Sequence, residues 1–79
     1  MARIVNEYLK RQLKERNTVH DIVTATYDYF EKEGEVYFQI DTYGRLSREN
    51  PEKISQSIQV DKDMAVVLIK LLRDAFELE

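Results

Sequence analysis

The sequence contains no cysteine, one histidine, one proline and two glycines. Without cysteine the chain forms no disulfide, no thiolate zinc site and no thiol nucleophile, so a hydrophobic core must hold the fold unaided. The two glycines, Gly34 and Gly44, are isolated, which excludes the glycine-rich loop that cradles a phosphate. No apolar run approaches the length of about 18 residues that a membrane-spanning helix needs, so we expect no contact with a membrane.

The length of 79 residues predicts a single small domain over residues 1–79, with little room for both a core and a deep substrate cavity. Residues 1–13 are charged throughout, so a signal peptide is not expected, and we expect a cytoplasmic location. The net charge is −3 and is spread unevenly. The first 17 residues carry five bases against two acids, and the rest of the chain is acidic.

The start of the chain is typical of an amphipathic helix. One stripe with spacings of three and four is apolar: Ile4, Val5, Tyr8, Leu9 and Leu13. The opposite stripe is charged: Arg3, Glu7, Lys10, Arg11 and Lys14. This pattern predicts a helix over residues 2–16.

Residues 19–30 and 35–43 are rich in β-branched and aromatic side chains, which predicts two strands joined by a loop over 31–34. With a four-residue loop, Phe30 pairs with Glu35 and Tyr29 pairs with Val36. Alternation then places the large apolar side chains of both strands on one face and polar side chains on the other. A helix over 19–30 is the alternative, because the apolar residues there also approximate the helical period.

Residues 54–60 alternate cleanly between apolar and polar, which predicts a third strand, and Asp61 is suited to cap a helix over 62–78. The expected fold is α+β: an α-β-β-β-α two-layer domain, in which two helices cover one face of a three-stranded antiparallel meander. The Ile54–Val60 strand then forms an edge without charge, proline or glycine. Such an edge predicts a homodimer in which two copies pair along it.

Neither catalysis nor metal binding is expected. His20 and Asp21 are neighbours on a strand and therefore point to opposite faces, so they do not form a dyad. The serines lack a positioned base, the carboxylates form no pair, and no metal-ligand spacing occurs. We therefore expect a non-enzymatic protein without a cofactor.

The open face of the sheet is the candidate site for a protein partner. Its side chains combine tyrosine with amides, hydroxyls and a carboxylate, a mixture that protein-binding surfaces favour. These residues are Tyr37, Gln39, Asp41, Tyr43, Ser55, Ser57 and Gln59. The alternative is an ordinary half-solvated antiparallel face, which is also polar.

Nucleic-acid binding is a second possible function. The basic residues that would contact phosphates are Lys10, Arg11, Lys14, Arg45 and Arg48. The α-β-β-β-α order resembles that of double-stranded RNA-binding domains, although the likeness covers topology only. Those domains carry a lysine cluster at the start of the second helix, where this chain reads Asp61-Lys62-Asp63, and the net negative charge also argues against a large phosphate footprint.

The string Phe38-Gln-Ile-Asp-Thr-Tyr-Gly44, followed by Ser55-Gln-Ser-Ile-Gln59 and an apolar helix, resembles a family of small uncharacterised prokaryotic proteins associated with mobile or defence-related genes. The resemblance covers residues 38–78 and implies no activity. It favours an accessory or inhibitor protein of bacterial or phage origin. Together these observations predict a protein-interaction module that uses an acidic, tyrosine-containing sheet face.

Overall fold

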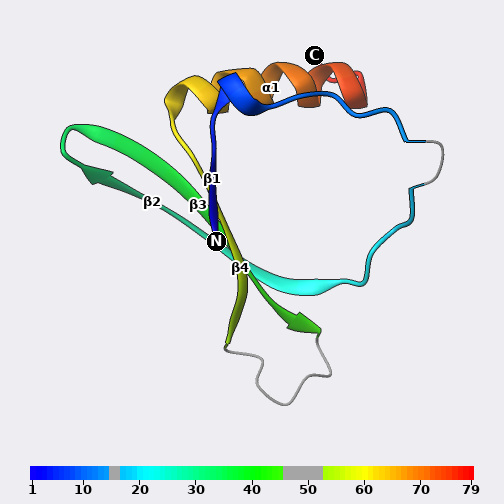
Figure 1. The fold of residues 1–79 in the computed structure, drawn as a ribbon, viewed down its shortest axis with the longest axis horizontal. Helices are drawn as coiled ribbons and strands as arrows, with labels where there is room; N and C mark the ends of the chain where they lie inside the picture. The colour runs from blue at the N-terminus through cyan, green and yellow to red at the C-terminus, as the bar shows by residue number, and fades with distance from the viewer. Residues whose placement is uncertain (15–16, 46–52) are drawn as a thin grey trace.

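The computed structural model describes residues 1–14, 17–45 and 53–79. Along the chain the elements are β1 (Ala2–Ile4), the short 3-10 helix η1 (Asn6–Tyr8), β2 (Val23–Lys32), β3 (Glu35–Arg45), β4 (Ile54–Val60) and α1 (Lys62–Phe76) (Figure 1). The sheet has the order β1-β4-β3-β2, with β1 parallel to β4 and the other pairs antiparallel. The α+β class is confirmed. The predicted α-β-β-β-α layout with two helices is not found, because the order is β1, η1, β2, β3, β4 and α1. The topological likeness to double-stranded RNA-binding domains depended on that layout and is therefore lost.

The helix predicted over 2–16 is not found: residues 2–14 form β1, η1 and a segment without regular secondary structure, and residues 15–16 lie outside the described residues. Ala2, Arg3 and Ile4 pair in parallel with Ile58, Gln59 and Val60. This pairing satisfies backbone groups on the outer side of β4 that would otherwise be unpaired. An amphipathic helix draws most of its stability from packing its apolar stripe. Here Leu13, at the end of that stripe, is exposed, and Ala2–Ile4 pair with β4 instead.

The first predicted hairpin is confirmed, and the helical alternative for residues 19–30 is wrong. Its connection is shorter than expected, because only Glu33 and Gly34 lie between Lys32 and Glu35. Both turn residues have positive φ, 54° and 82°, as a two-residue type I′ turn requires. Tyr29 consequently pairs with Phe38 instead of Val36. A displacement of two residues leaves the side chains of the regularly paired part, from Ala25 to Phe30, on their predicted faces, whereas a register shift separates Val23 from Ala25.

The third strand, Ile54–Val60, is confirmed, but it lies inside the sheet. Since β1 pairs with its last three residues, the predicted homodimer through the Ile54–Val60 edge loses its basis. A register shift between Thr42 and Tyr43 interrupts the pairing of β3 with β4. The C-terminal helix is also confirmed, with Asp61 as its N-cap.

The position of α1 differs from the prediction. The helix does not cover the apolar side of the sheet; it lies beyond one end of the sheet, and its main contacts are with β4 and η1 (Figure 1). The buried residues of the described chain are few and lie in β4 and at the start of α1: Ser57, Val60 and Met64. One side of the sheet, here called the apolar face, stays exposed and comprises Tyr27, Tyr29, Val36, Phe38, Ile40 and Ile58.

Candidate protein-binding face

The opposite side of the sheet, here called the polar face, is organised by side-chain hydrogen bonds. Gln59 Nε2 donates to Gln39 Oε1 at 2.6 Å, and Gln39 Nε2 donates to Asp41 Oδ1 at 2.8 Å. The same carboxylate oxygen accepts from Ser57 Oγ at 2.6 Å. These four residues, from two neighbouring strands, form one continuous chain that we call the polar network. Their side chains hold one another in place across β3 and β4.

Tyr37 lies at the end of the polar network and is held by two aromatic contacts. Its ring centroid is 5.7 Å from that of Phe30, and the guanidinium carbon of Arg3 lies 5.3 Å from the same centroid. Further along the sheet, Thr26 Oγ1 and Tyr43 Oη are 3.2 Å apart. Both tyrosines of the polar face therefore have a defined neighbour, and each leaves part of its ring accessible.

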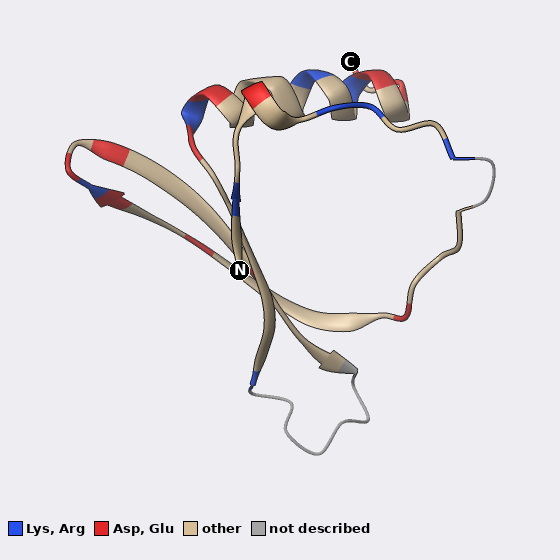
Figure 2. Ribbon diagram, viewed as in Figure 1, with Lys and Arg blue, Asp and Glu red and all other residues tan. Residues whose placement is uncertain are grey.

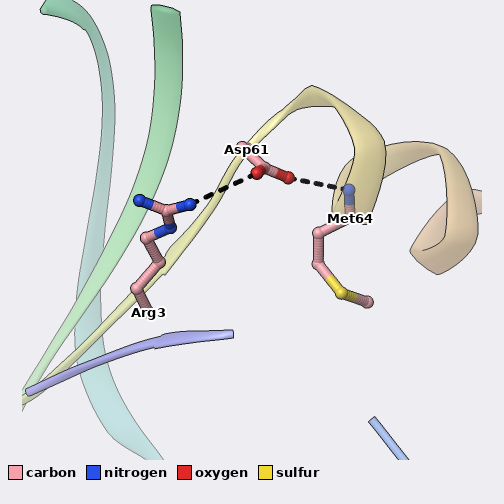
Figure 3. A network of polar contacts seen from close by, with 3 residues as sticks. All are labelled: Arg3, Asp61 and Met64. Carbon is pink, nitrogen blue, oxygen red and sulfur yellow. Dashed lines mark hydrogen bonds and ion pairs between the residues drawn. The ribbon is translucent and has the colours of Figure 1, made fainter. Parts of the chain in front are cut away.

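Arg3 also joins the sheet to the helix. Its Nη2 lies 3.6 Å from Asp61 Oδ2, while Asp61 Oδ1 accepts from the backbone N–H of Met64 at 2.9 Å (Figure 3). Asp61 thus caps α1 with one oxygen and binds β1 with the other. Met64, whose N–H receives this cap, is fully buried. The joint between β1, β4 and α1 therefore fixes the direction in which the helix leaves the sheet.

The structure places most of the predicted partner-binding residues on the polar face, with different roles. Tyr37, Gln39, Asp41, Tyr43 and Gln59 are half-buried and available at the surface. Ser57 is only 7% exposed, so it supports Asp41 and offers little to a partner. Ser55 is exposed near the register shift and has no place in the polar network.

A shallow depression opens beside the polar network, where β1 meets β4. Its volume is about 330 Å³, and it is lined by Met1, Ala2, Arg3, Gln39, Ile54, Ser57 and Gln59. Sequence reasoning missed this feature because it assigned Arg3 to a helix. It also missed Phe30, which lies on the polar face; its position in the alternation of β2 was the available signal.

The charge of the polar face is close to balanced. Among the described residues, Asp28, Glu35 and Asp41 lie on this side of β2 and β3, together with Lys32 and the Arg3 of β1. The acidic character expected from the sequence is therefore weakened by Arg3. Figure 2 shows that the most acidic part of the sheet is the tip of the β2–β3 hairpin.

The basic residues predicted for nucleic-acid binding are not assembled into a stripe. Lys10 and Arg11 line a groove of about 720 Å³ between the segment after η1 and α1, where Asp74 also lies. Lys14 is exposed in the irregular segment, and Arg45 ends β3. Arg48 lies outside the described residues. Within the described residues 1–14, no helix aligns Lys10, Arg11 and Lys14 along one stripe.

The described residues show no arrangement that points to catalysis. They contain no group of three or more potential metal ligands, and His20 is exposed. Every buried polar side-chain atom in the described part has a hydrogen-bond partner, so none is left aimed at a ligand. No helix there combines the length and the hydropathy that crossing a membrane requires.

No protein-family model, no curated protein and no solved structure matches this chain. The resemblance of residues 38–78 to small prokaryotic proteins therefore stays a prediction.

Proposed function

We propose that this chain is a non-enzymatic protein-interaction module that binds a protein partner through its polar face. The observation that carries the proposal is the ordered polar network, Gln59–Gln39–Asp41–Ser57, with Tyr37 held beside it. Side chains that are already fixed lose little conformational entropy when a partner docks. Tyrosine supplies rigid contact area, and amides supply adaptable hydrogen bonds.

The partner is best described by the chemistry of this face. Its charges nearly cancel, so recognition depends on aromatic and amide contacts more than on a strong field. A protein surface with exposed aromatic groups and hydrogen-bonding groups fits it, and a modestly basic rim would suit Asp28 and Glu35. An accessory or inhibitor protein of bacterial or phage origin, located in the cytoplasm, is the context that we propose.

The proposal is tested by capture with a matched pair of variants. Tagged wild-type protein, Tyr37→Ser and Tyr8→Ser are each used to capture proteins from cells that encode the chain, followed by quantitative mass spectrometry. Tyr8 is exposed in η1, away from both sheet faces, and serves as the control. We expect a partner that is retained by Tyr8→Ser and lost with Tyr37→Ser. Equal capture by both variants, or no specific capture, would contradict the proposal.

Nucleic-acid binding is the competing function, and it is tested on the same preparation. The protein is titrated with duplex DNA and duplex RNA at low and high salt. Binding to phosphates weakens steeply as salt rises, because counterions are released on association. Salt-sensitive binding that disappears in Lys10→Glu/Lys14→Glu would replace the protein-interaction proposal.

A further inference from the structure

Within the part of the chain that the structure describes, two apolar surfaces are exposed. On the apolar face, Tyr29 is 67% exposed and even Phe38, in a strand with neighbours on both sides, is 36% exposed. On α1, Ile69, Leu72 and Phe76 follow at helical spacing and form an exposed stripe, with Phe76 69% exposed. We call these three residues the free stripe. The groove beside the segment after η1 is lined by other helix residues, such as Val67 and Leu71.

The exposed area is too large for a compact monomer. A folded monomer of 9.4 kDa exposes about 5,000 Å², whereas this chain exposes 7771 Å². The radius of gyration is 14.8 Å, against about 11.6 Å for a compact chain of this length. The exposed side chains of the two apolar surfaces contribute to this excess. Stable homodimers bury about 2,000 Å² or more in total, or about 1,000 Å² from each copy, which is well within this excess.

The helix of the same chain is not placed to cover the apolar face. Only Asp61 separates β4 from α1, and its two carboxylate oxygens are tied to Arg3 and to the Met64 N–H. This joint directs the free stripe beyond the end of the sheet. A second copy has no such restriction.

We propose that the apolar face is covered by α1 of a second copy, in a reciprocal two-fold dimer. The free stripe of each copy packs on the apolar face of the other. A single two-fold rotation therefore buries both exposed surfaces of each copy. The helix fits within the length of the face, because a 15-residue helix spans about 22 Å and the 10-residue β2 about 33 Å. Lys70, which lies further round the helix from the free stripe, stays in solvent.

The dimer leaves the polar face free, since that face lies on the other side of each sheet. It is therefore independent of the partner-binding proposal, and the Tyr37→Ser capture experiment is a separate readout. Two variants test the dimer: Phe76→Lys on the free stripe and Tyr29→Glu on the apolar face. Lys70→Glu, which changes a charge on the solvent side of the same helix, is the matched control.

The mass of each protein is measured by sedimentation equilibrium across a wide concentration range, with far-UV circular dichroism to show that each variant is folded. We expect a dimer for the wild type and for Lys70→Glu. Each of the other two variants places one charge in both interfaces of the dimer, so we expect its dissociation constant to rise on the order of 100-fold. In an equimolar mixture of Phe76→Lys and Tyr29→Glu, one of the two interfaces is native and the other pairs lysine with glutamate, so the dimer should return.

Each remaining outcome overturns the proposal. A wild-type protein with the mass of one chain at all concentrations shows that the second copy is not the occupant, and a different protein is then the cover. A dimer that resists both variants uses another surface. A dimer that is broken by Phe76→Lys but not by Tyr29→Glu joins helix to helix. Failure of the mixture to recover the dimer excludes the helix-on-sheet arrangement.

Discussion

The bond between Ser57 and Asp41 offers the sharpest test of the polar network. Asp41 Oδ1 accepts from Ser57 Oγ and from Gln39 Nε2, at 2.6 and 2.8 Å. In Asp41→Ala both donors lose their acceptor. Ser57 is only 7% exposed, so its hydroxyl has little access to water, and a buried unsatisfied donor costs about 1–3 kcal/mol. The half-buried Gln39 amide is partly rehydrated, so we expect a total loss of about 2–3 kcal/mol.

The complementary change, Ser57→Ala, removes a donor but leaves Asp41 with Gln39 and solvent, so we expect a loss of about 1 kcal/mol. In the double variant the buried donor is gone, and the loss should be about 2 kcal/mol. The coupling energy of the cycle is then about 1–2 kcal/mol. A chain of this length has a total stability of about 4–12 kcal/mol, so all three variants should remain folded.

The assay is urea unfolding followed by circular dichroism, at one fixed protein concentration because association shifts apparent stability. The exposed pair Thr26–Tyr43, with its oxygens 3.2 Å apart, provides a control cycle with Thr26→Ala and Tyr43→Phe. Because water replaces that contact, its coupling should stay below about 0.5 kcal/mol. A Ser57–Asp41 coupling no larger than the control would refute the polar network as a preorganised unit.

Three further predictions concern the frame that carries the site. Phe38→Ala should lower the free energy of unfolding in urea by about 2–3 kcal/mol. This is less than the roughly 3–5 kcal/mol of a fully buried ring, because the Phe38 ring stacks on Tyr27 but stays part-exposed. A loss smaller than that of the exposed Thr24→Ala would contradict the strand pairing. Asp61→Ala should lower the free energy of unfolding by about 1–2 kcal/mol, because the N-cap of α1 is lost. Asp61→Asn should lower it by less than about 0.5 kcal/mol, since asparagine keeps the cap and loses only the ion pair with Arg3. Equal losses would show that the ion pair contributes more than the cap. Glu33→Asn should raise the free energy of unfolding by about 0.5–1 kcal/mol, because Glu33 has a φ of 54° and asparagine adopts positive φ more readily. Gly34→Ala should lower it by about 1 kcal/mol, because Gly34 also has positive φ. The opposite order would exclude the type I′ turn.

The elements with local signals were predictable. The hairpin strands, Ile54–Val60 and the capped helix after Asp61 were all identified from alternation, β-branched content and capping chemistry. The faces also survived an error in the turn, because a register displacement of two residues keeps the alternation. The partner-binding residues, chosen by face, were therefore brought together even though their exact pairs were wrong.

The start of the chain shows where local signals fail. The same residues that suit one stripe of a helix, such as Ile4 and Val5, also suit an extended strand. The choice between them depends on whether an apolar surface or an unpaired strand edge is available, and a one-dimensional pattern carries no information on either. The edge prediction failed for the same reason, since it needed to know that β1 pairs with Ile58–Val60.

Some signals depend only on neighbours in the chain: period-two alternation, turn chemistry and the cap at Asp61. The sequence by itself therefore determined three strands, their two faces and the final helix. Its composition alone excluded cysteine chemistry. The position of α1 depends on the one-residue connection at Asp61 and on the contacts of the helix with β4 and with the distant η1. Only the tertiary structure decided that Arg3 joins the polar face and that the helix leaves the apolar face uncovered. The physical reason is that hydrogen bonds and ion pairs between distant segments compete with local propensity, and here they outweighed it.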